Sequence, residues 1–184
     1  MALSKDEMLD LLWSKEQIRD LVLRYCRACD RADYALLESV YHPDAQDEHG
    51  FNKSGLAREF LDAIPAMRPG LDELQHNVTN HLISVEGDKA EGEVYIVAYH
   101  RFTGPDGPML MVTGGRYLDL YERRNGEWRI SHRRCIDDWS VNLPAPAAIA
   151  NEFTDGALPR GRAGKTDPSY EFFRLLSAAS PTPN

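Results

Sequence analysis

The sequence has few cysteines and no long apolar run, and both scarcities narrow the class of protein. Only 3 of its 184 residues are cysteines, a small and odd number that fits a reducing compartment better than a disulfide-stabilised secreted domain. The N-terminal stretch MALSKDEMLDLLW carries acidic residues inside its apolar run and lacks a signal-peptide cleavage site. No window approaches the roughly 20 apolar residues of a transmembrane helix. We therefore expect a cytoplasmic protein that has no membrane partner.

Positive charge is also in short supply. Lys and Arg number 21 against 29 Asp and Glu, which gives a net charge of −8. Because nucleic-acid binding needs a basic face, and the Lys and Arg residues are scattered here, we expect no nucleic-acid partner. The sequence also lacks a glycine-rich phosphate loop, a nucleophile elbow and a nicotinamide-binding fingerprint.

The strongest periodic pattern predicts a helix over residues 16–30. Its apolar residues recur at the spacing of one helix face: Ile18, Leu21, Val22, Tyr25, Cys26 and Cys29. Asp30 falls at the edge of this stripe, in the last turn. The Cys26-x-x-Cys29 spacing lies within the buried face, so we interpret both cysteines as small core residues rather than a redox pair.

Shorter helical patterns lie on either side of this helix. Residues 4–14 predict a short helix that leads into it. Asp33 is a candidate N-cap for a second helix that ends at the His-Pro pair 42–43, and residues 44–55 are expected to form a loop. Ser54 can cap a third helix that runs through Ile64 and is broken by Pro65 and by Pro69-Gly70.

The middle of the chain changes to strand patterns separated by turn sequences. The predicted strands are 75–85, 89–103, 109–123 and 127–139. Asn125-Gly126 between two alternating runs is a strong hairpin signal, and Gly114-Gly115 suggests a bulge. Helices followed by a meander predict an α+β fold, with N-terminal helices packed on a curved, mostly antiparallel sheet that encloses a pocket.

The C-terminal part has a different composition. We divide the chain into a domain over 1–143 and an extended Pro-, Ala- and Gly-rich tail over 144–184, with a possible short helix at 169–178. Three alternatives stay open for this tail: it folds over the mouth of the pocket, it packs on a neighbouring subunit, or it is partly disordered.

Several polar side chains fall on predicted core or pocket positions. An Asp paired with a His can act as a dyad in which the carboxylate orients the imidazole and the imidazole removes a proton from substrate. On the strand 75–85, alternation puts His76 and Asn80 on one face with apolar neighbours. The alternatives are a structural histidine and an ion pair of Asp30 with Arg27, Arg31 or an arginine of the last strand. Residues 42–49 contain metal-ligand types at no recognised spacing, so we expect no metal site.

Three segments carry a resemblance to a known family. The helix end YCRACD (25–30), the strand start LQHN (74–77) and the hairpin GRYLDLYERRNGEWRI (115–130) resemble SnoaL-like proteins of the NTF2-like superfamily, over roughly residues 10–140. The resemblance implies the NTF2-like cone of helices against a curved sheet. Residues 144–184 lie outside it.

Within that superfamily the pattern is most similar to lyases that use no cofactor, namely scytalone dehydratase, hexachlorocyclohexane dehydrochlorinase and bile-acid dehydratase. The resemblance implies that Asp30 and His76 form the catalytic dyad and that Tyr25 and Arg133 bind or protonate a substrate oxygen. The third-strand histidine of scytalone dehydratase has no counterpart here, since Gly114-Gly115 occupy that region. We expect substrate-binding side chains at these further positions: Tyr41, His49, Asn80, His100 and Tyr117.

The implied activity is elimination, or C–C cleavage, on a small hydrophobic substrate of aromatic or polycyclic type. Many relatives are trimers or dimers, so the resemblance also implies a homo-oligomer. Two alternatives stay open: isomerase or cyclase chemistry of the ketosteroid-isomerase and polyketide-cyclase type, and a non-catalytic binding module or enzyme small subunit.

Overall fold

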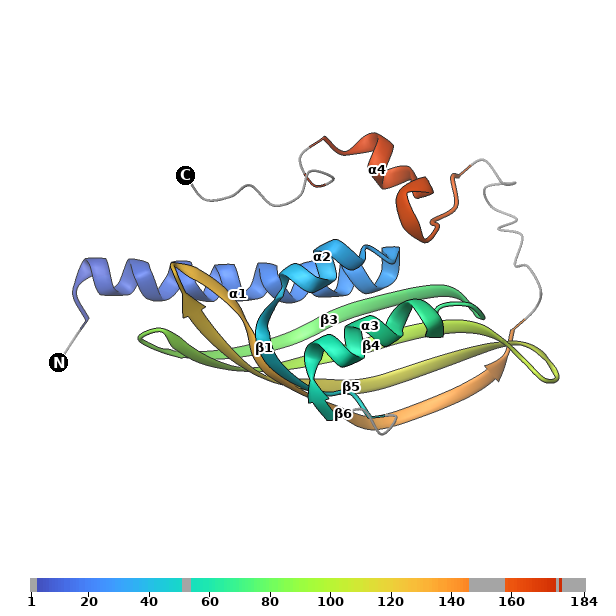
Figure 1. The fold of residues 1–184 in the computed structure, drawn as a ribbon, viewed down its shortest axis with the longest axis horizontal. Helices are drawn as coiled ribbons and strands as arrows, with labels where there is room; N and C mark the ends of the chain where they lie inside the picture. Colours follow the sequence, from blue (N-terminus) through green and yellow to red (C-terminus); the bar gives the residue numbers. More distant parts are fainter. Residues whose placement is uncertain (1–2, 51–53, 146–157, 175, 177–184) are drawn as a thin grey trace.

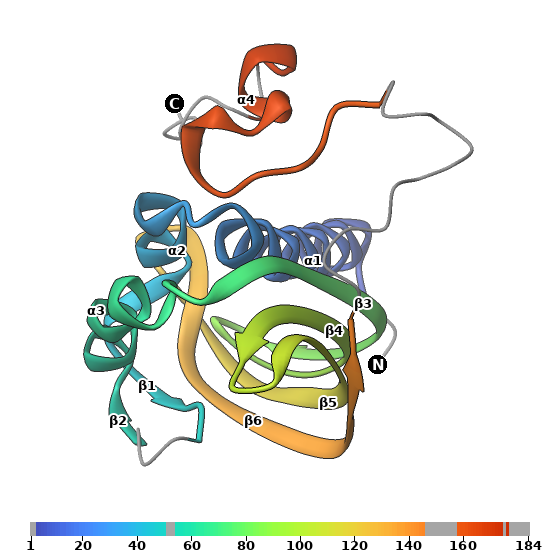
Figure 2. The ribbon, with the colours of Figure 1, turned by 90° about the vertical axis from the view of Figure 1, so that its right-hand side faces the viewer.

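A strongly curved sheet and one long helix laid against it make up most of the structure (Figures 1 and 2). The computed structural model describes residues 3–50, 54–145, 158–174 and 176. Its elements, in chain order, are α1 (Lys5–Arg31), α2 (Tyr34–Ser39), β1 (Tyr41–Glu48), β2 (Ser54–Leu56), α3 (Ala57–Met67), β3 (Leu71–Glu86), β4 (Lys89–Gly104), β5 (Gly107–Arg124), β6 (Glu127–Pro144), the 3-10 helix η1 (Gly164–Thr166) and α4 (Pro168–Phe172).

The first helix, α1, is one continuous helix of 27 residues. The helix predicted at 4–14 is therefore observed, but it is continuous with the helix predicted at 16–30, because no Pro or Gly interrupts the junction. Ser4 and Glu7 form a capping box, in which Ser4 Oγ accepts from the Glu7 N–H at 3.3 Å and Glu7 Oε2 accepts from the Ser4 N–H at 2.7 Å. Ala32, in the left-handed region with φ 51°, ends the helix one residue past its last turn.

The segment after α1 differs in part from the prediction. Asp33 caps α2 as predicted, since its Oδ1 accepts from the Leu36 N–H at 3.3 Å. The loop predicted over 44–55 is wrong at both ends, because its first residues belong to β1 and its last to β2. β1 pairs in parallel with β6 and antiparallel with β2. Pairing with these two strands stabilises β1, although its polar sequence is not typical of a strand. One of the two, β6, is distant in the sequence.

The third helix starts later than predicted, continues through the first predicted break and ends just before the second, Pro69-Gly70. Leu56, not Ser54, is the N-cap residue of α3, and no side chain caps it. Pro65 lies inside the helix, which continues to Met67. A proline removes one helical hydrogen bond, and in this case that loss does not end the helix.

The sheet contains six strands in the order β2-β1-β6-β5-β4-β3. All neighbouring pairs are antiparallel except β1 and β6. The four predicted strands are confirmed as a sequential meander, and two shorter strands, β1 and β2, extend the sheet beyond β6. α1 packs against both β3 and β6. Because those strands lie on either side of β4 and β5, the helix closes over the concave face, as Figure 2 shows. The predicted α+β, NTF2-like fold is confirmed.

Two of the register shifts in the sheet bear on the predictions made from the strand patterns. One lies between Gly114 and Gly115 where β5 pairs with β6, as predicted for this glycine pair. The other lies between Val78 and His81 where β3 pairs with β4. Beyond this second shift the alternation reverses, so that Asn80 and Leu82 are exposed while His81 is partly buried.

The core lies between α1 and the concave face of the sheet. Its α1 side consists of the buried stripe that the periodicity predicts, and its sheet side includes Val94, Tyr117, Tyr121 and Ile130. None of the helices within the described ranges is both long and apolar enough to cross a membrane.

The described part of the C-terminal region packs on the end of α1. Arg31 Nη1 lies 3.1 Å from Asp167 Oδ2, and the Tyr170 hydroxyl donates to Asp33 Oδ2 at 2.7 Å. The short helix predicted at 169–178 is observed as α4 over Pro168–Phe172, while residues 175, 177 and 178 fall outside the described ranges. β6 continues to Pro144, one residue into the predicted tail.

Candidate active site

Asp30 and His76 lie in direct contact where the end of α1 meets β3. Asp30 Oδ1 is 2.7 Å from His76 Nδ1, and the His76 backbone N–H donates to both carboxylate oxygens, at 3.1 and 3.2 Å. Both side chains are 11% exposed. A carboxylate accepts hydrogen bonds only, so in the neutral imidazole this contact places the hydrogen on Nδ1 and leaves the lone pair on Nε2. A carboxylate in this position orients an imidazole ring, which is the geometry that proton transfer by a histidine needs.

A row of polar side chains continues from His76 across the concave face. In the sheet register His76 is opposite Ala98, and Ala98 is opposite Thr113. His100 lies on the same face of β4, with its ring centroid 5.5 Å from that of His76. Burial, and secondly the neighbouring His76, lowers the pKa of His100 to about 4, so its imidazole is neutral at pH 7.

Two buried atoms of this row have unused hydrogen-bonding capacity. His100 Nδ1 and Thr113 Oγ1 are both shielded from solvent and have no hydrogen-bond partner among the described residues. Since buried polar atoms are normally paired, such atoms beside an oriented base are candidate contacts for a ligand.

Arg133 lies deeper in the interior and is fully buried. Its Nε and Nη2 donate to the two carboxylate oxygens of Asp119, at 2.7 and 2.6 Å. The rings of Tyr25 and Tyr117 lie on it, with centroids 4.1 and 4.0 Å from Cζ. Although burial alone would lower it, the pKa of Arg133 is held well above its ordinary value by the Asp119 charge. Its third nitrogen, Nη1, is buried and has no hydrogen-bond partner in the described chain.

A second polar cluster joins β1 to the same interior. Asp47 is buried and accepts from the Tyr41 hydroxyl at 2.7 Å, while His49 Nδ1 lies 3.2 Å from its other oxygen. The same His49 nitrogen is 3.2 Å from Cys135 Sγ. Burial raises the pKa of the Cys135 thiol, so this Cys–His–Asp group is not an activated nucleophile.

The structure does not bring Asn80 to this site. The register shift that precedes His81 turns the Asn80 side chain to the exposed face of β3. His132, another histidine with a carboxylate partner, also lies away from the dyad, where its Nε2 is 2.8 Å from Glu48 Oε1.

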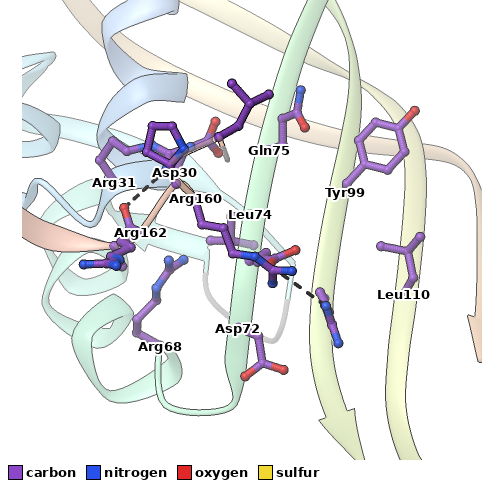
Figure 3. Close-up of a pocket in the computed structure, with 16 residues that line it drawn as sticks. Asp30, Arg31, Arg68, Asp72, Leu74, Gln75, Tyr99, Leu110, Arg160 and Arg162 are labelled. Carbon is purple, nitrogen blue, oxygen red and sulfur yellow. Dashed lines mark hydrogen bonds and ion pairs between the residues drawn. The ribbon is translucent and has the colours of Figure 1, made fainter. Parts of the chain in front are cut away.

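A cavity of about 580 Å³ opens beside the dyad (Figure 3). Its walls come from the end of α1, from residues 68–75, from β4 and β5, and from residues 158–163 of the C-terminal region. Of the nine predicted site residues, Asp30 alone is among those that line this cavity, and His76 beside it is not. Four others are buried in the interior, none more than 3% exposed: Tyr25, Tyr41, Tyr117 and Arg133. Residues 158–163 of the C-terminal region form part of the cavity wall. This position agrees with the first alternative for the tail, in which it folds over the mouth of the pocket.

Sequence reasoning missed three residues that shape the site: Thr113, Asp119 and Arg68, which lines the cavity. Thr113 could have been found from strand pairing, because it shares a face with His76 and Ala98. Arg68 lies between α3 and β3, and no sequence pattern indicated that it would line the cavity. Within the described ranges, no group of three or more His, Cys, Asp or Glu side chains is arranged to hold a metal ion.

Comparisons with known proteins agree with this architecture. The family model described as a SnoaL-like domain matches residues 10–134. No curated protein sequence matches the chain at a significant level. Among solved structures, the hexachlorocyclohexane dehydrochlorinase LinA-type3 of Novosphingobium barchaimii LL02 is 23% identical with a TM-score of 0.68, and the match covers 77% of this chain and 97% of that one.

Two further structures represent different activities on the same fold. A scytalone dehydratase-like protein of Novosphingobium aromaticivorans DSM 12444 is 18% identical with a TM-score of 0.62, covering 74% of this chain and 92% of that one. A β subunit attributed to an aromatic-ring-hydroxylating dioxygenase of the same organism is 20% identical with a TM-score of 0.57, covering 70% and 92%. At these identities the likeness establishes the fold alone.

Proposed function

The chain belongs to the SnoaL-like domain family, and from this premise we propose that it is a lyase in which Asp30 and His76 remove a proton from carbon. The observation that carries the proposal is the 2.7 Å contact between Asp30 Oδ1 and His76 Nδ1, beside a cavity that Asp30 lines. The contact fixes the imidazole tautomer and orients Nε2 as the base. Structural neighbours that include a dehydrochlorinase and a dehydratase-like protein support the reaction class.

The proposed step balances without a co-reactant. The proton on carbon passes to His76 Nε2, its electron pair forms the new double bond, and the leaving group departs from the adjacent carbon with the electrons of its own bond. The Asp30 carboxylate stabilises the imidazolium that forms. A hydroxide leaving group takes the proton from the His76 imidazolium or from the Tyr25 hydroxyl and departs as water, whereas a halide departs as the anion and the imidazolium proton passes to solvent.

Arg133 and Tyr25 complete the proposal as groups that stabilise negative charge. Arg133 stays protonated, and its buried Nη1 is a donor with no acceptor in the described chain. Burial raises the pKa of Tyr25 well above its ordinary value, so its hydroxyl keeps its proton and can donate it. In a dry interior such fixed donors act strongly on charge that develops in the transition state.

The test uses a probe that needs only a base for carbon acids. In 5-nitrobenzisoxazole, removal of one C–H proton breaks the N–O bond and gives a coloured phenolate. We expect turnover by the unsubstituted chain, and about 10²–10⁴-fold less by His76→Ala and Asp30→Asn. His132→Ala is the matched control, because it removes another partly buried histidine with a carboxylate partner. Equal turnover by all four proteins overturns the proposal.

The substrates named by the structural neighbours provide a second arm. Hexachlorocyclohexane is assayed by chloride release and scytalone by loss of water, with the same variants. Solvent deuterium entering a recovered substrate without loss of a fragment would indicate the isomerase alternative instead.

One observation favours a non-catalytic module. Tyr25, Tyr117 and Arg133 pack directly on one another, so side chains fill this part of the interior. A complete lack of turnover on all three compounds, together with co-purification of a large iron-containing partner, would support a small-subunit role of the kind that the dioxygenase β subunit represents.

A further inference from the structure

The wall of the cavity is rich in arginine, although the chain as a whole is acidic. Five arginines line it against three acidic residues, whereas the chain carries a net charge of −8. The arginines are Arg31, Arg68, Arg101, Arg160 and Arg162. A concave surface that concentrates one sign of charge raises the local concentration of ligands of the opposite sign.

The acidic residues of the wall do not balance these charges. Asp30 is bound to His76, and Glu73 lies at the long distance of 4.0 Å from Arg101. Arg31 is paired with Asp167, which lies outside the cavity lining. Asp72 is exposed, and with it the wall holds three acidic residues against five arginines.

Arg68 shows the clearest sign of a missing acceptor. Its Nη1 is shielded from solvent and has no hydrogen-bond partner among the described residues. A desolvated guanidinium N–H without an acceptor is unfavourable, and a ligand oxygen at that point would remove the penalty. Arg68 and Arg160 both line the cavity and are labelled in Figure 3, where they come from different segments of the chain.

The C-terminal segment that carries Arg160 is held in place by contacts of its own. Arg31 Nη1 donates to the Arg162 carbonyl at 3.3 Å, and the Arg162 N–H donates to Asp167 Oδ2 at 2.8 Å. Asp167 in turn caps α4. The position of Arg160 over the cavity is therefore tied to the end of the same helix that carries Asp30.

The rest of the lining suits an apolar body. Tyr99 and Leu110 from the sheet and Leu158 and Pro159 from the C-terminal segment supply it. We propose that this cavity binds an anionic group, a carboxylate or a phosphate ester, carried by a hydrophobic substrate, with Arg68 and Arg160 as its anion-binding residues. The inference rests on the proposed function in one respect: Asp30, which lines the cavity, links the bound molecule to the dyad.

Three probes with one naphthyl body test the inference by calorimetric titration of the full chain. They are 2-naphthoate, 2-naphthyl phosphate and the neutral 2-naphthylmethanol. We expect the anions to bind more tightly than the alcohol, and Arg68→Gln to weaken anion binding by about tenfold, as for a lost charge-assisted hydrogen bond, with no effect on the alcohol. Binding of naphthoate alone assigns a carboxylate, and binding of naphthyl phosphate alone assigns a phosphate.

Arg58→Gln is the matched control, since it makes the same charge change at a side chain that is 70% exposed on α3 and does not line the cavity. Arg68→Lys keeps the charge and tests whether a loss in Arg68→Gln is a folding defect. Anion affinities that are the same in Arg68→Gln, Arg160→Gln and the unsubstituted chain overturn the inference, as does an equal loss in Arg58→Gln. Calorimetric titration measures binding without turnover. Loss of the proposed His76 activity would therefore leave the anion-binding result unchanged, and absence of anion binding would leave the turnover assays unchanged.

Discussion

Arg133 and Asp119 form an ion pair in which neither side chain is exposed to solvent. The pair joins the neighbouring strands β5 and β6 on the concave face, where Asp119 also accepts from the Tyr121 hydroxyl at 2.7 Å. Because water does not reach these two side chains, each charge is stabilised mainly by the other. Removing one partner leaves the other buried and uncompensated, which costs far more than the pair itself contributes.

We therefore expect Asp119→Asn to lower the free energy of unfolding by about 3 kcal/mol or more. Urea denaturation followed by circular dichroism measures the change. Glu127→Gln is the control, because it removes the carboxylate partner of Arg129 in a pair whose side chains are 48% and 29% exposed; such pairs contribute less than about 1 kcal/mol. Similar losses in the two variants would contradict the role assigned to the buried pair.

The glycine pair of β5 gives a second prediction, in which two adjacent residues behave differently. A Cβ on Gly115 would lie 2.3 Å from the carbonyl oxygen of Ile136, a backbone atom of the paired strand. A Cβ on Gly114 would meet the ring of Trp139, a side chain that is 51% exposed and can turn away. We expect Gly115→Ala to cost about 3 kcal/mol and Gly114→Ala about 1 kcal/mol, measured by denaturant unfolding. A larger loss of stability for Gly114→Ala than for Gly115→Ala would contradict the conclusion that the close approach of the β6 backbone requires glycine at position 115.

The fold could be predicted wherever local pattern and final structure agree. The buried stripe of α1 and the Asn125-Gly126 hairpin are set by residues close in sequence, so periodicity and turn chemistry reveal them. β1 could not be predicted in this way, because its backbone partners lie on β6, more than 80 residues away along the chain at positions such as Asp47 and Arg133.

The site was predictable to a similar extent and for similar reasons. Asp30 and His76 were expected together, and the structure places them in contact. The expectation for Asn80 failed because a single register shift reverses side-chain direction, and nothing in the sequence of β3 marks that shift. The cavity escaped prediction because its arginines come from separate segments, Arg68 before β3 and Arg160 in the C-terminal region, whose meeting depends on tertiary structure. The expected homo-oligomer stays a prediction.

Two partly buried histidines make the stability of the protein depend on pH. Burial lowers the pKa of both His81 and His100 to about 4, with a further lowering of His100 by His76. In the unfolded chain a histidine titrates near 6.5, so between pH 6.5 and 4 the unfolded state binds more protons than the folded state. Stability is then complete above about pH 6.5 and is lost as the pH falls toward 4.

We expect each of these histidines to account for roughly 2 kcal/mol of that loss, allowing for its partial exposure. Urea unfolding at a series of pH values from 7 to 4 measures the slope. His100→Gln and His81→Gln should each flatten it, and the double variant should flatten it further, because glutamine binds no proton in this range. Leu82→Gln, an exposed substitution next to His81 that removes no titrating group, should keep the full slope. A pH dependence that is the same in all these proteins would mean that the acid sensitivity arises from groups other than His81 and His100.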